Sequence, residues 1–461
     1  MKRPFHMAPS QTIIVSFALM ISVGAALLNL PIASKTGRSV GLLNAVFTSA
    51  SASCVIGLTV VNTAEYWTWF GKGMILLLTQ IGALGFMSVM IAAMLFTRHP
   101  ITLRNRQAIQ ASFNQDDIGG MAKFAKNVVL ITLIFESAGA ALLAVSFYFG
   151  APAAVGQSVC QGIFHSISAF CNAGFDNFGS DSLARFQNNT PVNLVMMALI
   201  TAGGLGFPVW AEMGRFIKNP QKRSVRNRII HLDLHTKMVF VITAALTLSG
   251  FVLFLLFEWS NPATLGLLTP FQRMQAALFQ SVTLRTAGFH TIPQEGLTEE
   301  SKFISCILML IGGSPASTAG GIKTIAVGIL IFSMLSLLKG RNDLEAFKRS
   351  LPLDLLQKAL TVTSLMLIVT VASTLFLCFS ERANPYPHTF LDLLFEACSA
   401  AGTVGLGMGI TPYLSAAGKI VLIICMYLGR LGPVTVVVAL NAKLHAGSDR
   451  IGYPNERVII G

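Results

Sequence analysis

Charged residues are scarce in this sequence. Lys, Arg, Asp and Glu make up 11% of its 461 residues, whereas soluble domains carry roughly 25%. A soluble enzyme, a nucleic-acid-binding protein and a disordered chain are therefore all disfavoured. The 53% of hydrophobic residues and the mean hydropathy of +0.66 are instead typical of a polytopic membrane protein, whose side chains face lipid or one another.

Paired cysteines, nucleotide motifs and metal-ligand clusters are missing too. The seven cysteines contain no CxxC pair, and an odd number fits no complete disulfide framework, so small buried apolar thiols are expected. There is no P-loop or glycine-rich nucleotide motif. His231 and His235 are four residues apart, but no third ligand lies near them, which favours packed or solvated histidines over a metal site. The first apolar run, residues 13–33, is too long for a signal-peptide core and indicates an uncleaved membrane helix.

Long apolar stretches dominate what is present. Eight of them suit the roughly 20 residues of a membrane-spanning helix: 12–33, 74–96, 125–149, 193–213, 237–257, 303–338, 355–379 and 417–440. Four shorter segments, too short to cross, lie between the members of each pair: 42–54, 157–171, 274–285 and 389–402. The predicted fold is all-α, with eight membrane-spanning helices in four helix–pore-loop–helix repeats around a central pore.

Glycine tetrads support this repeat. The short segments lead into Val55-Ile56-Gly57-Leu58, Asn172-Ala173-Gly174-Phe175, Thr286-Ala287-Gly288-Phe289 and Thr403-Val404-Gly405-Leu406, with central glycines 117, 114 and 117 residues apart. A second glycine cluster follows each: Gly82-Ala83-Leu84-Gly85, Gly203-Gly204-Leu205-Gly206, Gly312-Gly313-Ser314-Pro315 and Gly429-Arg430-Leu431-Gly432. Such near-constant spacing indicates internal repeats, with boundaries at 1–97, 98–218, 219–340 and 341–461, the last including the C-terminal tail.

Basic residues predict the orientation. The inter-repeat segments and the two termini hold 22 Lys and Arg residues, against nine in the remaining loops. Because cytoplasmic loops are enriched in Lys and Arg, both termini are expected in the cytoplasm, and the short segments enter from outside. The formal net charge of +13 then reflects orientation rather than nucleic-acid binding.

Four uncharged glycine tetrads around one axis suggest a cation site. Irregular backbone is tolerated at membrane depth where it lines a cavity, and a ring of carbonyl oxygens can replace the hydration shell of a cation. Glycine at the third position permits a positive φ and a close backbone approach. The alternative, plain turns or tight helix packing, explains one tetrad more readily than four.

The sixth stretch is predicted to break within the membrane. It contains Gly312, Gly313, Ser314, Pro315, Ser317, Thr318, Gly320 and Gly321, followed by Lys323. Glycines, a proline and small hydroxyl residues would form a flexible polar plug that moves without disturbing packed helices; a static kink is the alternative.

These residues resemble the Trk/Ktr/HKT superfamily of potassium transporters. The resemblance rests on residues 164–175, 285–289 and 317–323 and covers the whole chain; the length and the ending from Tyr453 to Gly461 resemble the Ktr membrane subunit (KtrB-like) most. It implies that the four tetrads form a selectivity filter whose carbonyls hold potassium, with glycine at all four central positions favouring potassium over sodium. Ile56 departs from the family pattern, in which a small hydroxyl residue is common there.

The resemblance also implies a gate, partners and ions. Residues 312–323 would be an intramembrane gating loop beneath the filter, with Arg430 nearby as a positive barrier. No covalently bound cofactor is implied; potassium is the substrate, and sodium is a candidate coupling or activating ion. Implied partners are a KtrA-like ring of cytoplasmic nucleotide-binding regulatory subunits, docked on the basic loops, and a second copy in a homodimer. Anionic lipid headgroups suit the same loops.

Several single charges leave two interpretations open. Arg430 lies within an apolar segment, where a charge suggests function, or a structural ion pair with Glu136. Lys323 would face the loop or extend to the cytoplasm. Glu396 would cap the fourth short helix or add negative potential at the outer mouth. Asp176 would attract cations to the vestibule or be a solvated loop residue.

Two other functions compete with a gated potassium pore. An alternating-access symporter of a small solute also uses broken helices, but with inverted repeats, whereas the charge pattern here indicates four parallel ones. An intramembrane enzyme would need a cluster of acid, base, nucleophile or metal ligands, which the scattered His and Cys residues do not supply. The sequence is therefore not expected to be that of an enzyme.

Overall fold

Four short helices occupy the predicted re-entrant segments. The computed structural model describes residues 9–85, 121–150, 154–179, 181–218, 232–341 and 343–432. The short helices are α2 (Leu42–Ser53), α8 (Val155–Phe170), α13 (Pro270–Thr283) and α17 (Phe390–Gly402). At most two residues separate each helix from its glycine tetrad, which confirms the prediction that short helices lead into the tetrads.

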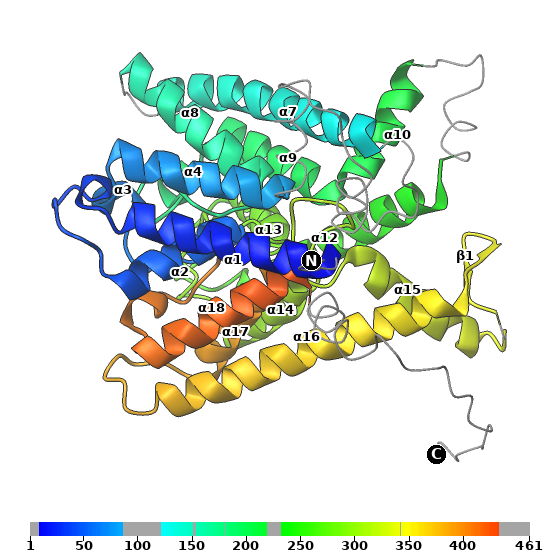
Figure 1. Cartoon of the computed structure of the whole chain (residues 1–461). Helices are drawn as coiled ribbons and strands as arrows, with labels where there is room; N and C mark the ends of the chain where they lie inside the picture. Colours follow the sequence, from blue (N-terminus) through cyan, green and yellow to red (C-terminus); the bar gives the residue numbers. More distant parts are fainter. Residues whose placement is uncertain are drawn as a thin grey trace, which may run out of the picture.

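A long apolar helix precedes each short one. These helices are α1 (Pro9–Leu28), α7 (Met121–Gly150), α12 (Leu234–Glu258) and α16 (Leu353–Ser380). Within the described residues they are the four continuous helices long and apolar enough to cross a bilayer. Figure 1 shows α1, α7 and α16 running in roughly the same direction, with α7 and α16 at opposite edges.

Each of the first three long helices is joined to its short helix by the same hydrogen bond. Ser49, Ser166 and Ser281 donate to the carbonyls of Ile21, Glu136 and Thr247, each at 2.7 Å. The serines sit against helix glycines, Gly24, Gly139 and Gly250, where a side chain would collide with the serine oxygen. Small residues thus let each pair of helices pack closely.

The helices that follow the tetrads all begin with a side-chain cap. They are α4 (Trp69–Leu84), α9 (Thr190–Leu205), α14 (Glu299–Leu310) and α18 (Ala416–Leu431), and their N-caps are Thr68, Asn189, Thr298 and Ser415. Each cap accepts a hydrogen bond from a backbone N–H of the first helical turn. The chain therefore starts the second helix of each pair by the same device.

The glycine clusters end these helices, which corrects one prediction. The stretch 193–213 was expected to be a single span, but α9 stops at Leu205 and α10 (Phe207–Lys218) leaves at 102°. Gly206 between them has φ +94°, a conformation that favours glycine. Gly85 and Gly432, with φ +76° and +80°, end α4 and α18 in the same way. The second parts of the predicted spans 74–96 and 417–440 lie outside the described residues.

The sixth stretch is broken as predicted. A non-helical loop separates α14 from α15 (Thr324–Leu338). Between α15 and α16 a two-stranded hairpin pairs β1 (Glu345–Ala346) with β2 (Arg349–Ser350), which the all-α prediction did not include. Short helical turns complete the fold: α3 (Thr63–Tyr66), η1 (Pro31–Ala33), η2 (Ala184–Phe186) and η3 (Thr411–Tyr413).

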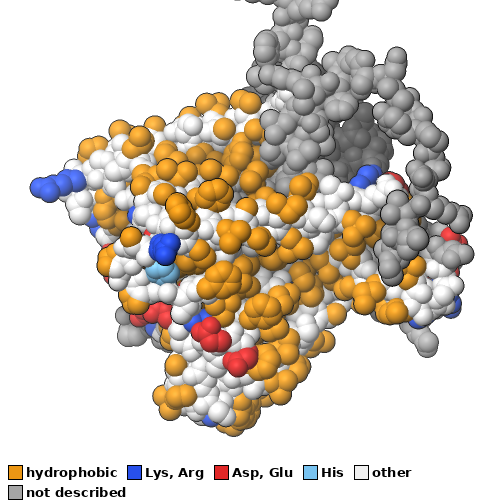
Figure 2. Space-filling view, turned by 90° about the horizontal axis from the view of Figure 1, so that it is seen from below, with side chains coloured by type: hydrophobic (Ala, Val, Ile, Leu, Met, Phe, Trp, Pro, Cys, Tyr) orange, Lys and Arg blue, Asp and Glu red, His pale blue; other side chains and the backbone are white. Residues whose placement is uncertain are grey.

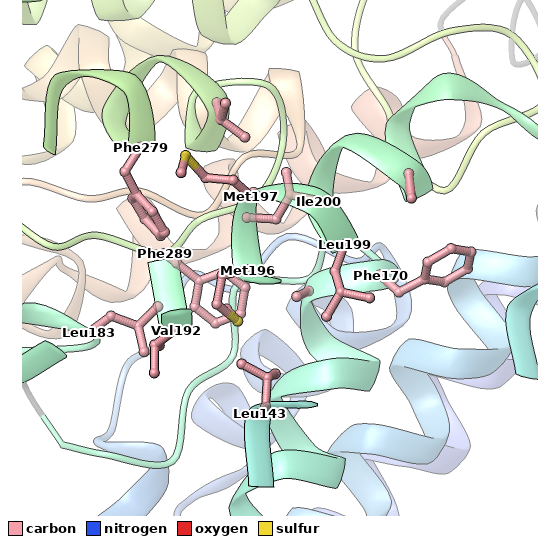
Figure 3. Packing of buried hydrophobic residues seen from close by; sticks show 14 of the residues in the cluster. Leu143, Phe170, Leu183, Val192, Met196, Met197, Leu199, Ile200, Phe279 and Phe289 are labelled. Atoms are coloured by element: carbon pink, nitrogen blue, oxygen red, sulfur yellow. The ribbon is translucent and has the colours of Figure 1, made fainter. Parts of the chain in front are cut away.

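Apolar packing joins the helices inside, and apolar side chains also cover the outside. Figure 3 shows Phe279 and Phe289 packed near Met196 and Met197, so that α13 and α9 share one core. Hydrophobic side chains spread over most of the face in Figure 2. On α16 the exposed large hydrophobic residues are Leu353, Leu360, Leu367, Ile368, Val371, Leu375, Phe376 and Phe379. A surface of this kind suits lipid rather than water.

Candidate ion-conduction site

The four tetrads share one backbone conformation. Their first residues, Val55, Asn172, Thr286 and Thr403, have φ between +57° and +66°, and their glycines have φ between +69° and +98°. A left-handed valine or threonine is a genuine conformational outlier that costs of order 1–3 kcal/mol. The same left-handed conformation recurs in four loops, in three of them at a β-branched residue, which indicates a structure built for a common purpose.

The glycines and the second-position carbonyls form a closed ring. The contacts around it are Gly57 with the carbonyl of Ala173, Gly174 with Ala287, Gly288 with Val404, and Gly405 with Ile56. A methyl group on Gly174 or Gly288 would lie 3.0 or 2.6 Å from the facing oxygen, and one on Gly57 or Gly405 would lie closer still. Each loop thus touches the next and the fourth returns to the first, with four backbone oxygens between them.

One buried hydroxyl of each short helix holds its tetrad. Ser51 and Ser399 accept hydrogen bonds from the N–H groups of Gly57 and Gly405, at 3.1 and 3.0 Å. Ser168 and Thr283 instead donate to the carbonyls of Phe175 and Phe289, both at 2.6 Å. All four side chains are fully buried. None of these four residues was predicted from the sequence.

The predicted gating loop is closed at its base. Gly312 donates its N–H to the Ile322 carbonyl at 2.9 Å, and Ile322 donates to Leu310 at 3.0 Å. Within the loop, Ser317 Oγ donates to the Ser314 carbonyl, and Ala316 has φ +53°. The segment is therefore a hydrogen-bonded loop between two helix ends.

The loop touches the end of the second short helix and the first residue of the fourth tetrad. Gly320 donates its N–H to Thr403 Oγ1 at 3.0 Å, and Thr318 Oγ1 donates to the Phe170 carbonyl at 3.1 Å. Ser314 donates to the Gly204 carbonyl at 2.9 Å, and Phe207 donates to Ala316. The loop therefore lies at the C-terminal ends of the short helices, held by the break between α9 and α10.

Arg430 links this loop to the first glycine cluster. Its guanidinium donates to the carbonyls of Thr318, of Gly82 at 2.6 Å and of Ala83 at 3.3 Å. Within the described residues it makes no ion pair with Glu136, which accepts from Gln80 Nε2 and Cys171 Sγ, so that alternative was wrong. Carbonyl oxygens of the loop and of α4 accept the guanidinium hydrogens instead.

Lys323 also remains with the loop. It is the N-cap residue of α15 and is partly buried, and its ammonium donates to the Ala319 carbonyl at 2.7 Å. This contact favours the first of its two interpretations over extension to the cytoplasm.

Glu396 has a different place from the one predicted. The N-terminus of α17 is capped by Thr389 together with Asp392. Glu396 lies one turn further, fully buried, and accepts hydrogen bonds from Met408 N–H at 3.0 Å and Thr411 Oγ1 at 2.8 Å. It therefore ties the fourth short helix to the chain that leaves the fourth tetrad.

This geometry predicts different outcomes for two replacements of Glu396. Glu396→Gln keeps an oxygen for Met408 N–H and offers its amide to Thr411 Oγ1, so the melting temperature in detergent should change little. Glu396→Ala leaves a buried N–H and hydroxyl without partners and should cost about 2–4 kcal/mol of unfolding free energy. Equal melting temperatures for the two variants would contradict the assigned contacts.

Arg285 and Asp176 both lie at least partly inside the protein. Arg285 was counted among the nine basic residues of the outer face, but it is 9% exposed and donates to the Gly312 carbonyl at 3.2 Å, deep in the protein. Asp176, just after the second tetrad, is partly buried and accepts from Phe178 N–H at 3.1 Å; burial raises its pKa to about 6. It is thus not a fully solvated loop residue.

The histidines and the basic loops are only partly covered by the described residues. Within the described residues, no group of three or more His, Cys, Asp or Glu side chains is arranged to hold a metal ion; His231 lies outside them. The basic residues of the two termini lie outside them as well, as do seven between the repeats: Arg98, Arg104, Arg106, Lys222, Arg223, Arg226 and Arg228.

Together these elements can bind a dehydrated cation. Four backbone oxygens meet at one ring, and the C-terminal ends of short helices, which carry partial negative charge, point toward it. A polar loop lies against the same helix ends. With its apolar helices, the chain is a multi-pass membrane protein of the ion-transport class.

Comparison with known proteins places it in a family. The profile of the TrkH family, described as cation transport proteins, matches residues 1–449, and the chain belongs to this family. It is similar to the potassium/sodium uptake protein NtpJ of Enterococcus hirae, with 37% identity over 99% of this chain and 98% of that protein. It is also similar to the Ktr system potassium uptake protein B of Bacillus subtilis, with 36% identity over 98% and 97%.

A solved structure supports the fold. The potassium transporter TrkH of Vibrio parahaemolyticus superimposes with a TM-score of 0.72 at 20% identity, covering 95% of this chain and 86% of that one. These similarities confirm the resemblance to the Trk/Ktr superfamily and its Ktr branch. The family consists of ion transporters, so the prediction that the chain is not an enzyme is confirmed as well.

Proposed function

We propose that this protein takes up potassium across the cell membrane through a filter formed by the four glycine tetrads. The observation that carries the proposal is the ring in which each tetrad glycine contacts the second-position carbonyl of the next loop. Potassium, as the substrate, would be held by those backbone oxygens. The names of the relatives, which specify potassium or potassium and sodium uptake, support this choice of ion.

The side chain of Ile56 does not conflict with this role. Ile56 is fully buried, and its carbonyl faces Gly405. Its oxygen therefore takes part in the ring although the side chain has no hydroxyl. Sodium is proposed as a coupling or activating ion and not as an equal competitor in the filter.

The architecture proposed is four parallel helix–pore-loop–helix repeats with eight spans. The recurring N-caps and the recurring serine between long and short helix support it. With 22 basic residues in the inter-repeat segments and termini, both termini are proposed to be cytoplasmic. The membrane would be the bacterial plasma membrane.

A regulatory partner is also proposed. The printed names of relatives refer to a Ktr system, which suits a membrane subunit that works with a separate cytoplasmic ring of nucleotide-binding subunits. The basic loops offer that ring a docking surface, and a homodimer would present two sets of loops to it.

Uptake by the purified chain tests the proposal. In liposomes loaded with potassium, radioactive rubidium should accumulate, and external potassium should compete with it much better than equimolar sodium. Gly288→Ser, which places a side chain against the Val404 carbonyl, should abolish this selectivity. Equal competition by sodium, or selectivity unchanged in Gly288→Ser, would overturn the filter assignment.

A further inference from the structure

A small cavity lies beside the third tetrad, between the second and third helix pairs. It has a volume of about 20 Å³ and is lined by Ile200, Thr201, Gly204, Thr243, Thr247, Val282, Arg285 and Gly313. The walls come from α9, α12, the end of α13 and the predicted gating loop. A space of this size holds one water molecule or one ion of similar size.

Arg285 brings a positive charge into this cavity without an acidic partner. It takes part in none of the ion pairs found among the described residues. Its two terminal nitrogens donate to the carbonyls of Thr243 at 3.3 Å and Gly312 at 3.2 Å. Neutral carbonyls satisfy these hydrogens but do not cancel the charge, and an uncompensated charge within a membrane protein is costly.

Two polar groups of the cavity also lack partners. Arg285 Nε and Thr243 Oγ1 are both buried and make no hydrogen bond. Both can donate, and their residues line the same space. The Thr201 hydroxyl donates its own hydrogen to the Met197 carbonyl at 2.7 Å and accepts from neither Arg285 Nε nor Thr243 Oγ1. The site thus has two free hydrogen-bond donors, a full positive charge and room for one small ion or water molecule.

We propose that this cavity binds a single halide-sized anion, chloride in the cell, between Arg285 Nε and the Thr243 hydroxyl. The anion neutralises the guanidinium and satisfies both donors. A water molecule fits the volume and the hydrogen bonds but leaves the charge. Because Arg285 directly precedes Thr286, the anion also removes a positive charge from the neighbourhood of the ring. This last consequence alone rests on the proposed potassium function.

Crystals of the full-length protein grown in sodium bromide test the site without any flux measurement. Anomalous scattering should give a bromide peak between Arg285 and Thr243. A water molecule at that position, with no bromide peak at several hundred millimolar bromide, would overturn the proposal. Because this readout is independent of transport, it separates failure of the anion site from failure of the potassium assignment.

Thermal unfolding in detergent tests it in solution. At equal ionic strength, chloride should raise the Tm above that in gluconate, since a ligand that binds the folded state stabilises it. Thr243→Val keeps the shape but removes one donor, and should weaken halide affinity by about tenfold or more. Thr361→Val, at an exposed position of α16, is the matched control and should keep the wild-type response. A chloride effect that persists in Thr243→Val would place the anion elsewhere and contradict the proposal.

Discussion

Gly405→Ala should reduce potassium uptake to background. Gly405 has φ +92°, and an added methyl group would collide with the Ile56 carbonyl. The left-handed conformation costs an alanine about 1–2 kcal/mol, and the collision is with backbone, which cannot turn aside as a side chain would. The loop must shift, and the shift displaces a carbonyl oxygen of the ring. The measurement is rubidium uptake into liposomes containing the purified variant.

The loss of uptake caused by an alanine substitution should differ between the glycines of the ring. At Gly174 the added methyl group would lie 3.0 Å from the nearest carbonyl oxygen, a tight contact that small movements relieve. Gly174→Ala should therefore keep measurable uptake while discriminating less between potassium and sodium. If Gly405→Ala and Gly174→Ala were equally active, the close carbonyl contacts would not determine conduction.

Gly73→Ala is the matched control. Gly73 is exposed on α4, and an added methyl group has no neighbour within 4 Å. The same substitution there should leave uptake unchanged and stabilise the protein by about 0.5–1 kcal/mol, because glycine within a helix is unfavourable. Loss of uptake in this variant would show that the assay reports membrane insertion rather than the ring.

The position of the ring could be predicted from the sequence, but the buried hydroxyl groups that hold its loops in place could not. The tetrads recur every 114–117 residues in the same hydropathy context. This periodicity identifies the repeats even where the bounds of a single helix are predicted wrongly. Ser51, by contrast, lies in a run where Ser49 and Ser53 are equally small and polar. Which of these hydroxyls faces the tetrad depends on the helix rotation, and hydropathy carries no information about it.

The errors have similar physical causes. The bend at Gly206 was missed because apolar residues continue on both sides of it, and hydropathy averages across a break. Arg285 was placed outside because charges were assigned by their position along the chain, whereas a long side chain can turn inward and reach Gly312. Glu396 was taken for a cap because it lies near a helix start, although Thr389 and Asp392 already cap that helix.

Deletion of residues 315–319 should raise basal rubidium flux, in the absence of any regulatory subunit, by about tenfold or more. The deletion removes the loop contacts made by Ala316 and Thr318, including those with Phe207, Phe170 and Arg430. The bonds at the loop base, between Gly312 and Ile322, are retained. In the intact protein the open state of the loop would be a minor one, with a population of about 0.1–10%. The deletion would make the open state the major one, so the flux should rise by about tenfold or more.

Single substitutions should give smaller increases in a fixed order. Arg430→Ala leaves the loop without its link to Gly82, and Thr403→Val removes only the acceptor for Gly320 N–H. The expected order of flux is deletion, then Arg430→Ala, then Thr403→Val. Combining the deletion with Gly405→Ala should abolish the flux, because the ions would still have to pass the ring. If the deletion variant folds and conducts like the wild type, the loop is a static part of the helix break. If flux survives when the deletion is combined with Gly405→Ala, the ions take a path that does not pass the ring.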